Sequence, residues 1–187
     1  EAAQNLPPAP EDKGGWLGGL PVAIKDMMEV ESVRTTYASP IYKDFVPGFS
    51  HPMVEKLEAN GGLVLAKSNT PEFAAGASTF NEVFGKTRNP WNTDRSAGGS
   101  SGGAAASLAA RMLPIADGSD LGGSLRNPAA FNGVVGLRPT VGTVPNRNAR
   151  SHSLSRFGVE GPMGRTVADA ALVLAARAGP DPPDATS

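Results

Sequence analysis

The chain has 187 residues, 40% of them hydrophobic, and a formal net charge of −1 with a pI near 6.2. This length fits one ordinary domain with its own core. The near-neutral charge and the scattered lysines and arginines argue against nucleic acid as a partner. The absence of cysteine excludes disulfides and thiolate metal sites and favours the cytoplasm. No apolar run reaches the roughly 18–20 residues that a membrane helix needs, so no membrane partner is expected.

The first part of the chain divides into an arm and a core. Residues 1–15 are polar and rich in proline, which predicts an extended arm or linker, and residues 16–187 are expected to form the folded core. No signal peptide is visible, although the chain begins at Glu1 rather than Met, which leaves the true N-terminus open. Residues 20–25 are a short apolar run that ends on Lys25, which predicts a buried strand with its functional end at this lysine.

Residues 52–60 predict the first helix, because proline stands in its first turn and Gly61 follows its end in the C-cap position. Residues 62–67 (GLVLAK) predict a second buried strand. Thr70 is then expected to cap a helical turn that starts with Pro71.

The middle of the chain alternates between polar and apolar segments. Residues 85–99 are polar and predict a loop, whereas the alanine-rich residues 101–111 predict a helix. Residues 113–116 predict a strand that runs into the loop DGSDLGGS, and residues 133–137 predict another strand.

Residues 166–178 are the clearest helix, with Thr166 as the N-cap. Its predicted buried stripe consists of Val167, Ala170, Ala171 and Leu174. Because strands alternate with helices along the chain, the sequence predicts the α/β class with a mostly covered sheet.

Two glycine-rich segments hold serines: GGSSGG at residues 98–103 and SDLGGSLR at residues 119–126. Glycines beside a serine let the backbone approach a ligand and turn its N–H groups inward. In the second segment four successive residues carry free N–H donors, and such a run can form an anion-binding nest for a tetrahedral oxyanion. These four residues are Leu121, Gly122, Gly123 and Ser124. Each segment by itself is also typical of a solvated glycine-rich turn.

Together, residues 98–129 read GGSSGGAAASLAARMLPIADGSDLGGSLRNPA, and this stretch resembles the amidase-signature family. It contains GGSSGG, the G-x-D-x-G-G-S element and S-[aliphatic]-R-x-P. The resemblance extends to PVAIKD, FGKTRNPWN, GVVGLRPTVG and GPMGRTVADAALVL and covers nearly all of residues 16–183. It implies a mixed β-sheet core covered by α-helices. Family members are well over twice this length, so we expect the chain to hold only part of the full domain.

The resemblance also implies a role for each matching residue. Ser124 is the expected nucleophile, Ser100 the bridging serine after a cis peptide from Gly99, and Lys25 the base. The expected oxyanion donors are the N–H groups of Leu121, Gly122, Gly123 and Ser124. Residues expected to orient the relay and the loop are Ser101, Ser119, Asp120 and Arg126. Residues expected to contact the substrate are Phe73, Ala74 and Ala75.

The implied chemistry is hydrolysis of a small-molecule carboxylic amide to an acid and ammonia or an amine, through an acyl-enzyme on Ser124. A serine hydroxyl is a weak nucleophile and needs a base, and an ammonium cannot be one. Lys25 must therefore be neutral, so burial must lower its pKa substantially from about 10.4. The resemblance implies no cofactor. By itself, a lysine at a strand end is more typical of the surface.

Other site types fit the sequence less well. The pattern Gly98-x-Ser100-x-Gly102 also matches the nucleophile elbow of α/β-hydrolases, which requires a preceding strand and a later acid and histidine. The two histidines are His51 and His152, and His152 follows Ser100 too closely for that layout. GGSSGGAAAS lacks the lysine of a phosphate-binding loop. No aspartate has metal-ligand spacing with a histidine, so no metal is expected.

Two alternatives to a free-standing amidase remain open. The chain is alternatively an inactive fragment or structural remnant of the family, although every expected catalytic residue is present. It is alternatively the glutamine-hydrolysing subunit of a tRNA-dependent amidotransferase, which works with a protein partner. The stretch FGVEGPM at residues 157–163 favours the free-standing amidase. The oligomeric state, including a homodimer, is also left open.

Overall fold

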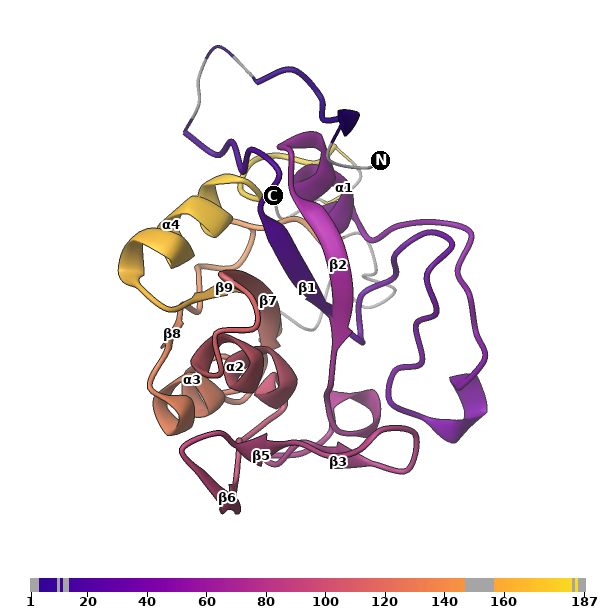
Figure 1. The fold of residues 1–187 in the computed structure, drawn as a ribbon. Coiled ribbons are helices and arrows are strands. Elements are labelled where there is room, and N and C mark those ends of the chain that lie inside the picture. The colour runs from indigo at the N-terminus through magenta and orange to yellow at the C-terminus, as the bar shows by residue number, and fades with distance from the viewer. Residues whose placement is uncertain (1–3, 10, 12–13, 147–156, 183, 185–187) are drawn as a thin grey trace.

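The computed structural model describes residues 4–9, 11, 14–146, 157–182 and 184. At its centre lies a five-stranded sheet in the order β2-β1-β7-β9-β8 (Figure 1). Strand β1 runs parallel to β2 and β7, whereas β9 runs antiparallel to β7 and β8. The strands are β1 (Pro21–Lys25), β2 (Leu63–Ser68), β7 (Ile115–Asp120), β8 (Val135–Gly136) and β9 (Val159–Gly164). The predicted α/β class with a mixed sheet is confirmed.

Two pairs of helices cover the two faces of this sheet. Helices α1 (Pro52–Ala59) and α4 (Val167–Ala175) pack with Val22 and Ile24 of β1 in one apolar cluster. Helices α2 (Gly102–Ala109) and α3 (Arg126–Asn132) pack with Ala23 of the same strand in another. Successive side chains of a strand point to opposite faces, so a continuous apolar run such as PVAIK can serve both clusters.

The polar stretch at residues 85–99, predicted to be a loop, instead contains short exposed strands. A hairpin pairs β5 (Arg88–Asn89) with β6 (Asn92–Ser96), and a second pairs β3 (Phe80–Asn81) with β4 (Gly85–Lys86). Asparagine side chains shape the first turn, since Asn89 Oδ1 accepts from Trp91 N at 2.9 Å and Asn92 Oδ1 accepts from Asp94 N at 3.0 Å. Side chain–backbone bonds of this kind form a turn without an alternating apolar pattern, which is why sequence reasoning missed the hairpin.

Three further differences from the predicted elements concern polar or proline-containing segments. Strand β7 continues through the predicted loop to Asp120, because its two aspartates are fully buried. Strand β9, with the sequence VEGPMG, and helix α3, with Pro128 in its first turn, were not predicted. Glycine and proline within a segment argue against a strand or a helix, and here the pairing with β7 overrides that tendency.

The predicted helix ends are confirmed at two places. Gly61 has a φ of +76° just after α1, and its N–H donates to Glu58 O. Thr166 and Asp169 form a capping box at the start of α4. The predicted stripe on α4 was wrong in part, because Val167 is 74% exposed and the buried positions are Ala170 and Val173.

Thr70 does not cap the turn that follows it. That turn is the 3-10 helix η3 (Glu72–Ala74), whose N-cap is Pro71 without a side-chain hydrogen bond. The Thr70 hydroxyl is buried and has no hydrogen-bond partner in the described part of the chain.

Candidate active site

Lys25 ends β1 with its side chain fully buried among serine hydroxyls. Its Nζ lies 2.6 Å from Ser100 Oγ, 2.9 Å from Ser119 Oγ and 3.1 Å from Ser101 Oγ. Its backbone N–H donates to Asp117 Oδ1 of the neighbouring strand at 2.5 Å, which fixes the end of β1 against β7. The structure thus brings together four of the residues predicted to form or orient the relay.

Burial lowers the pKa of Lys25 from 10.5 to about 8, because a charged ammonium is disfavoured away from water. The carboxyl groups of Glu160, Asp117 and Asp120 act in the opposite direction and limit this shift. A lysine with this pKa is neutral in a substantial fraction of molecules near pH 8. It can therefore accept a proton, as a base for the serine hydroxyl must.

Ser100 is placed by the backbone just before α2. The peptide between Gly99 and Ser100 is cis, as the family resemblance implied. A Cβ on Gly99 would lie 2.9 Å from backbone atoms of Ala77 and Ser78, so this close approach requires glycine. Ser100 is 1% exposed, and its hydroxyl meets the Lys25 amine.

The loop at residues 121–124 connects β7 to α3 and carries Ser124, which is half-buried. The Ser124 carbonyl accepts from Ser101 N at 3.2 Å, so the loop lies against the start of α2. The N–H of Gly123 donates to Asp120 Oδ1 at 2.8 Å and is therefore already engaged. The N–H groups of Leu121, Gly122 and Ser124 meet no acceptor within the described residues, which leaves three of the four predicted donors available.

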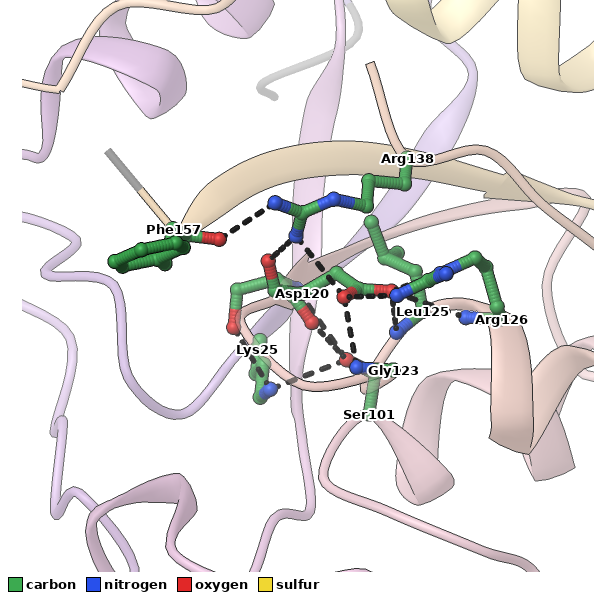
Figure 2. A network of polar contacts seen from close by, with 9 residues as sticks. Lys25, Ser101, Asp120, Gly123, Leu125, Arg126, Arg138 and Phe157 are labelled. Carbon is green, nitrogen blue, oxygen red and sulfur yellow. Dashed lines mark hydrogen bonds and ion pairs between the residues drawn. The ribbon is translucent and has the colours of Figure 1, made fainter. Parts of the chain in front are cut away.

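Asp120 holds this loop through six hydrogen bonds to its carboxylate. Its carboxylate accepts from the backbone N–H groups of Gly123, Leu125 and Arg126 and from the guanidinium of Arg126 at 3.0 and 3.1 Å. A further bond of 3.0 Å comes from Arg138, which also donates to the carbonyls of Asp120 and Phe157. Figure 2 shows the carboxylate between the two arginines.

Burial alone would raise the pKa of Asp120, but the hydrogen bonds from Arg126 and the loop backbone hold it well below the usual range. Sequence reasoning assigned Asp120 and Arg126 to the loop and missed Arg138. Arg138 lies within the matching stretch GVVGLRPTVG, but nothing in that stretch indicates which earlier residue it contacts.

A cavity of about 820 Å³ opens beside this cluster. Ser100, Ser119 and Ser124 line it, as do Leu121 and Gly122. The three residues predicted to contact substrate also line it: Phe73, Ala74 and Ala75. Lys25, Ser101 and Arg126 are not among the lining residues, so Lys25 reaches the cavity through the hydroxyls of Ser100 and Ser119. Phe73 and Ala74 have φ values of 50° and 56°, an uncommon backbone conformation at a cavity wall.

The rival site types gain no support from this geometry. Ser100 follows the peripheral β5–β6 hairpin rather than a strand of the central sheet, unlike a nucleophile elbow. His51 caps α1, since its Nδ1 accepts from Met53 N at 3.3 Å. His152 lies outside the described residues. Among the residues that the structure places, no group of three His, Cys, Asp or Glu could hold a metal ion. No helix in this part of the chain is long and apolar enough to cross a membrane.

Comparisons with known proteins agree with this site. The family model described as Amidase matches residues 1–187. One relative is the A-type subunit of glutamyl-tRNA(Gln) amidotransferase from Thermosynechococcus vestitus, which is 51% identical over 173 residues, covering 92% of this chain and 36% of that protein. The chain also resembles the peptide amidase of Stenotrophomonas maltophilia with a TM-score of 0.82 at 37% identity, covering 93% of this chain and 36% of that one.

A third structure is a bacterial aryl acylamidase of the amidase-signature enzymes, with a TM-score of 0.81 at 36% identity, covering 90% of this chain and 35% of that one. The chain therefore belongs to the amidase family, and its mixed α/β fold is the amidase-signature fold. It spans little more than a third of the length of these relatives.

We predict that Asp120→Asn lowers the free energy of unfolding at pH 7 by about 2 kcal/mol, because charged hydrogen bonds to both arginines are lost. Since the pKa of Asp120 is depressed in the folded state, its stabilisation is complete above the unfolded pKa of about 3.9 and is lost as the pH falls towards the folded value. The difference between wild type and variant should therefore narrow below about pH 4. Urea unfolding at a series of pH values measures it.

The exposed Asp94, whose backbone N–H is held by Asn92, supplies the control Asp94→Asn. It should change stability by less than about 0.5 kcal/mol. A variant Asp120→Asn as stable as Asp94→Asn at pH 7 would contradict the central role given to this carboxylate.

Proposed function

We propose that this chain carries the catalytic part of a serine amidase that hydrolyses a small carboxylic amide to an acid and ammonia or an amine. The observation that carries the proposal is the buried Lys25 amine, 2.6 Å from Ser100 Oγ in the wall of a cavity that Ser124 also lines. No other arrangement among the described residues supplies both a base and a serine at a cavity.

In the proposed first step Ser124 Oγ attacks the amide carbon, and its proton passes through the Ser100 hydroxyl to neutral Lys25. The carbonyl oxygen becomes an oxyanion, which the free N–H groups of Leu121, Gly122 and Ser124 stabilise. The fourth predicted donor, Gly123, would have to exchange its bond to Asp120 for one to the oxyanion.

The tetrahedral intermediate then collapses and the C–N bond breaks. Lys25 returns its proton through Ser100 to the leaving nitrogen, so ammonia or an amine departs and the acyl group remains esterified to Ser124. A water molecule attacks this ester with the same relay as base, releasing the acid and restoring the serine. The chain's own residues move every proton, and this reaction requires no cofactor.

The remaining predicted residues have supporting roles in this proposal. Ser101 and Ser119 hold the Lys25 amine in place, and Asp120 with Arg126 shapes the loop that presents Ser124. The segment of Phe73, Ala74 and Ala75 provides a wall against which the substrate lies.

We predict that a fluorophosphonate probe labels Ser124, because the probe traps an activated serine hydroxyl. Ser124→Ala should abolish labelling and turnover, while Ser107→Ala, in the same fold but away from the cavity, should retain both. Peptide mapping by mass spectrometry identifies the labelled serine. Labelling of Ser100 in a Ser124→Ala background at the wild-type rate would assign the nucleophile to Ser100 instead.

We predict that kcat/KM rises with pH through an apparent pKa of about 8 and then levels off, because only neutral Lys25 can accept the proton. Below that pKa the rate should fall about tenfold per pH unit. Lys25→Met, which keeps the length of the side chain, should remove this limb together with most of the rate.

The control is Lys86→Met, since Lys86 is exposed on β4. It should leave the pH profile unchanged. A Lys25→Met enzyme with the wild-type acid limb at near wild-type rate would show that another group is the base.

A second candidate function is favoured by the 51% identity with a subunit of glutamyl-tRNA(Gln) amidotransferase. In that case the amide is glutamine, and the ammonia is passed on within a complex with partner proteins. We predict that a panel of aliphatic, aryl and fatty amides with glutamine decides between the two, with the protein in its full natural length. Turnover of simple amides without a partner supports the amidase. Turnover of glutamine alone, and faster in the presence of partner proteins, supports the amidotransferase.

A further inference from the structure

Glu160 lies in the cavity wall without an assigned role in the relay. It stands in β9 directly opposite Ser119 of β7, whose hydroxyl contacts Lys25. Its side chain is only 6% exposed, and its Oε2 has no hydrogen-bond partner in the described part of the chain. Its Oε1 accepts only a long bond of 3.4 Å from Asn146 Nδ2. A buried carboxyl oxygen without a donor is costly, so this position suits a ligand that brings the donor.

The charges around the cavity indicate what kind of donor this is. Four acidic side chains line the cavity, and none of the described lysines or arginines does. Three of the four are already engaged: Asp120 by its arginines, Glu29 by Tyr37 Oη at 2.7 Å, and Asp184 by Asn146 N at 2.8 Å. Glu160 is the one that retains a buried oxygen without a partner among the described residues. An acidic wall with one open carboxyl oxygen favours a cationic donor.

We propose that Glu160 binds a protonated amino group of the substrate, so that the enzyme prefers amides that carry a primary ammonium on a short acyl chain. Residues directly opposite on antiparallel strands have Cβ atoms about 5 Å apart, which places Glu160 close to Ser119 and so to the relay. A short chain between the ammonium and the scissile amide follows from this proximity. The identity of the ligand as substrate rests on the amidase function proposed above.

The groups that face Glu160 come from three other elements. Asp117 lies on the same face of β7, Lys25 ends β1, and the fully buried Arg177 follows α4. Burial, Asp117 and Glu29 raise the pKa of Glu160 to about 8, while Lys25 and Arg177 act in the opposite direction. A bound ammonium stabilises the carboxylate, so binding releases a proton. The preference for amino-substituted amides should therefore grow as the pH rises through about 8.

The test compares 3-aminopropanamide, 4-aminobutanamide and 5-aminopentanamide with butanamide, pentanamide and hexanamide, in which a methyl group replaces the ammonium. The readout is the ratio of kcat/KM within each pair, because the protonation of Lys25 cancels in that ratio. For wild type the ratio should exceed one and increase several-fold between about pH 6.5 and about pH 8.5. Glu160→Gln, a nearly isosteric change, should lower it about tenfold and make it independent of pH in this range.

The matched control is Glu29→Gln, a carboxylate of the same cavity that Tyr37 already occupies. Its ratio should stay within about twofold of wild type. A second arm does not depend on hydrolysis: butylammonium should bind Ser124→Ala more tightly than 1-butanol does, and Glu160→Gln in that background should remove the difference. Calorimetry measures this binding.

A wild-type ratio of one for all three pairs, or an unchanged ratio in Glu160→Gln, would overturn the proposal. So would equal binding of butylammonium and 1-butanol. An enzyme that hydrolyses none of the amides but binds butylammonium through Glu160 would leave the ammonium site standing and overturn the amidase function instead.

Discussion

The burial of one lysine amine is the constraint on which the rest of this structure depends. A charged ammonium away from water is costly, and the protein lowers that cost by surrounding the Lys25 Nζ with three serine hydroxyls rather than with a carboxylate. A carboxylate at hydrogen-bond distance would stabilise the ammonium and keep the pKa high. Hydroxyls solvate either protonation state, so the pKa stays near 8.

Those hydroxyls come from two separate elements, and their placement requires the rest of the fold. Ser100 and Ser101 stand at the start of α2, and Ser119 stands in β7. Strand β1 must therefore lie between β2 and β7, with α2 packed on the same face. The close approach of α2 to β2 is visible at Gly103, where a Cβ would lie 2.3 Å from Asn69 N. The glycines of GGSSGG thus serve packing as well as the site.

A second buried charge organises the loop next to the relay. Asp120 ends β7 and binds the backbone of the following turn, while Arg126 and Arg138 neutralise it from two different segments. The two buried carboxyl groups near the relay are treated in opposite ways. Asp120 is fully compensated and therefore stays ionised and rigid, whereas Glu160 keeps an open oxygen towards the cavity. In our proposals the first carboxylate supports the reaction and the second selects the substrate.

The sequence by itself determined the relay and the class of the fold. Lys25 was recognised because an apolar strand ends on it within PVAIKD, and the two serine motifs were recognised from their glycine spacing and family resemblance. The central strands β1 and β2 and the helices α1, α2 and α4 were predicted because their apolar patterns and caps are local. The nucleophile, oxyanion and substrate roles of these residues remain proposals.

The tertiary structure alone decided which distant groups meet. Strand β9 has no strand pattern in VEGPMG and forms because β7 pairs with it, and that pairing places Glu160 opposite Ser119. Arg138 reaches Asp120 across 18 positions of the chain, and the hairpin of β5 and β6 forms from polar residues whose side chains bond to the backbone. Local patterns report how a segment can bury its own apolar side, whereas the partners of a buried charge depend on which strands become neighbours.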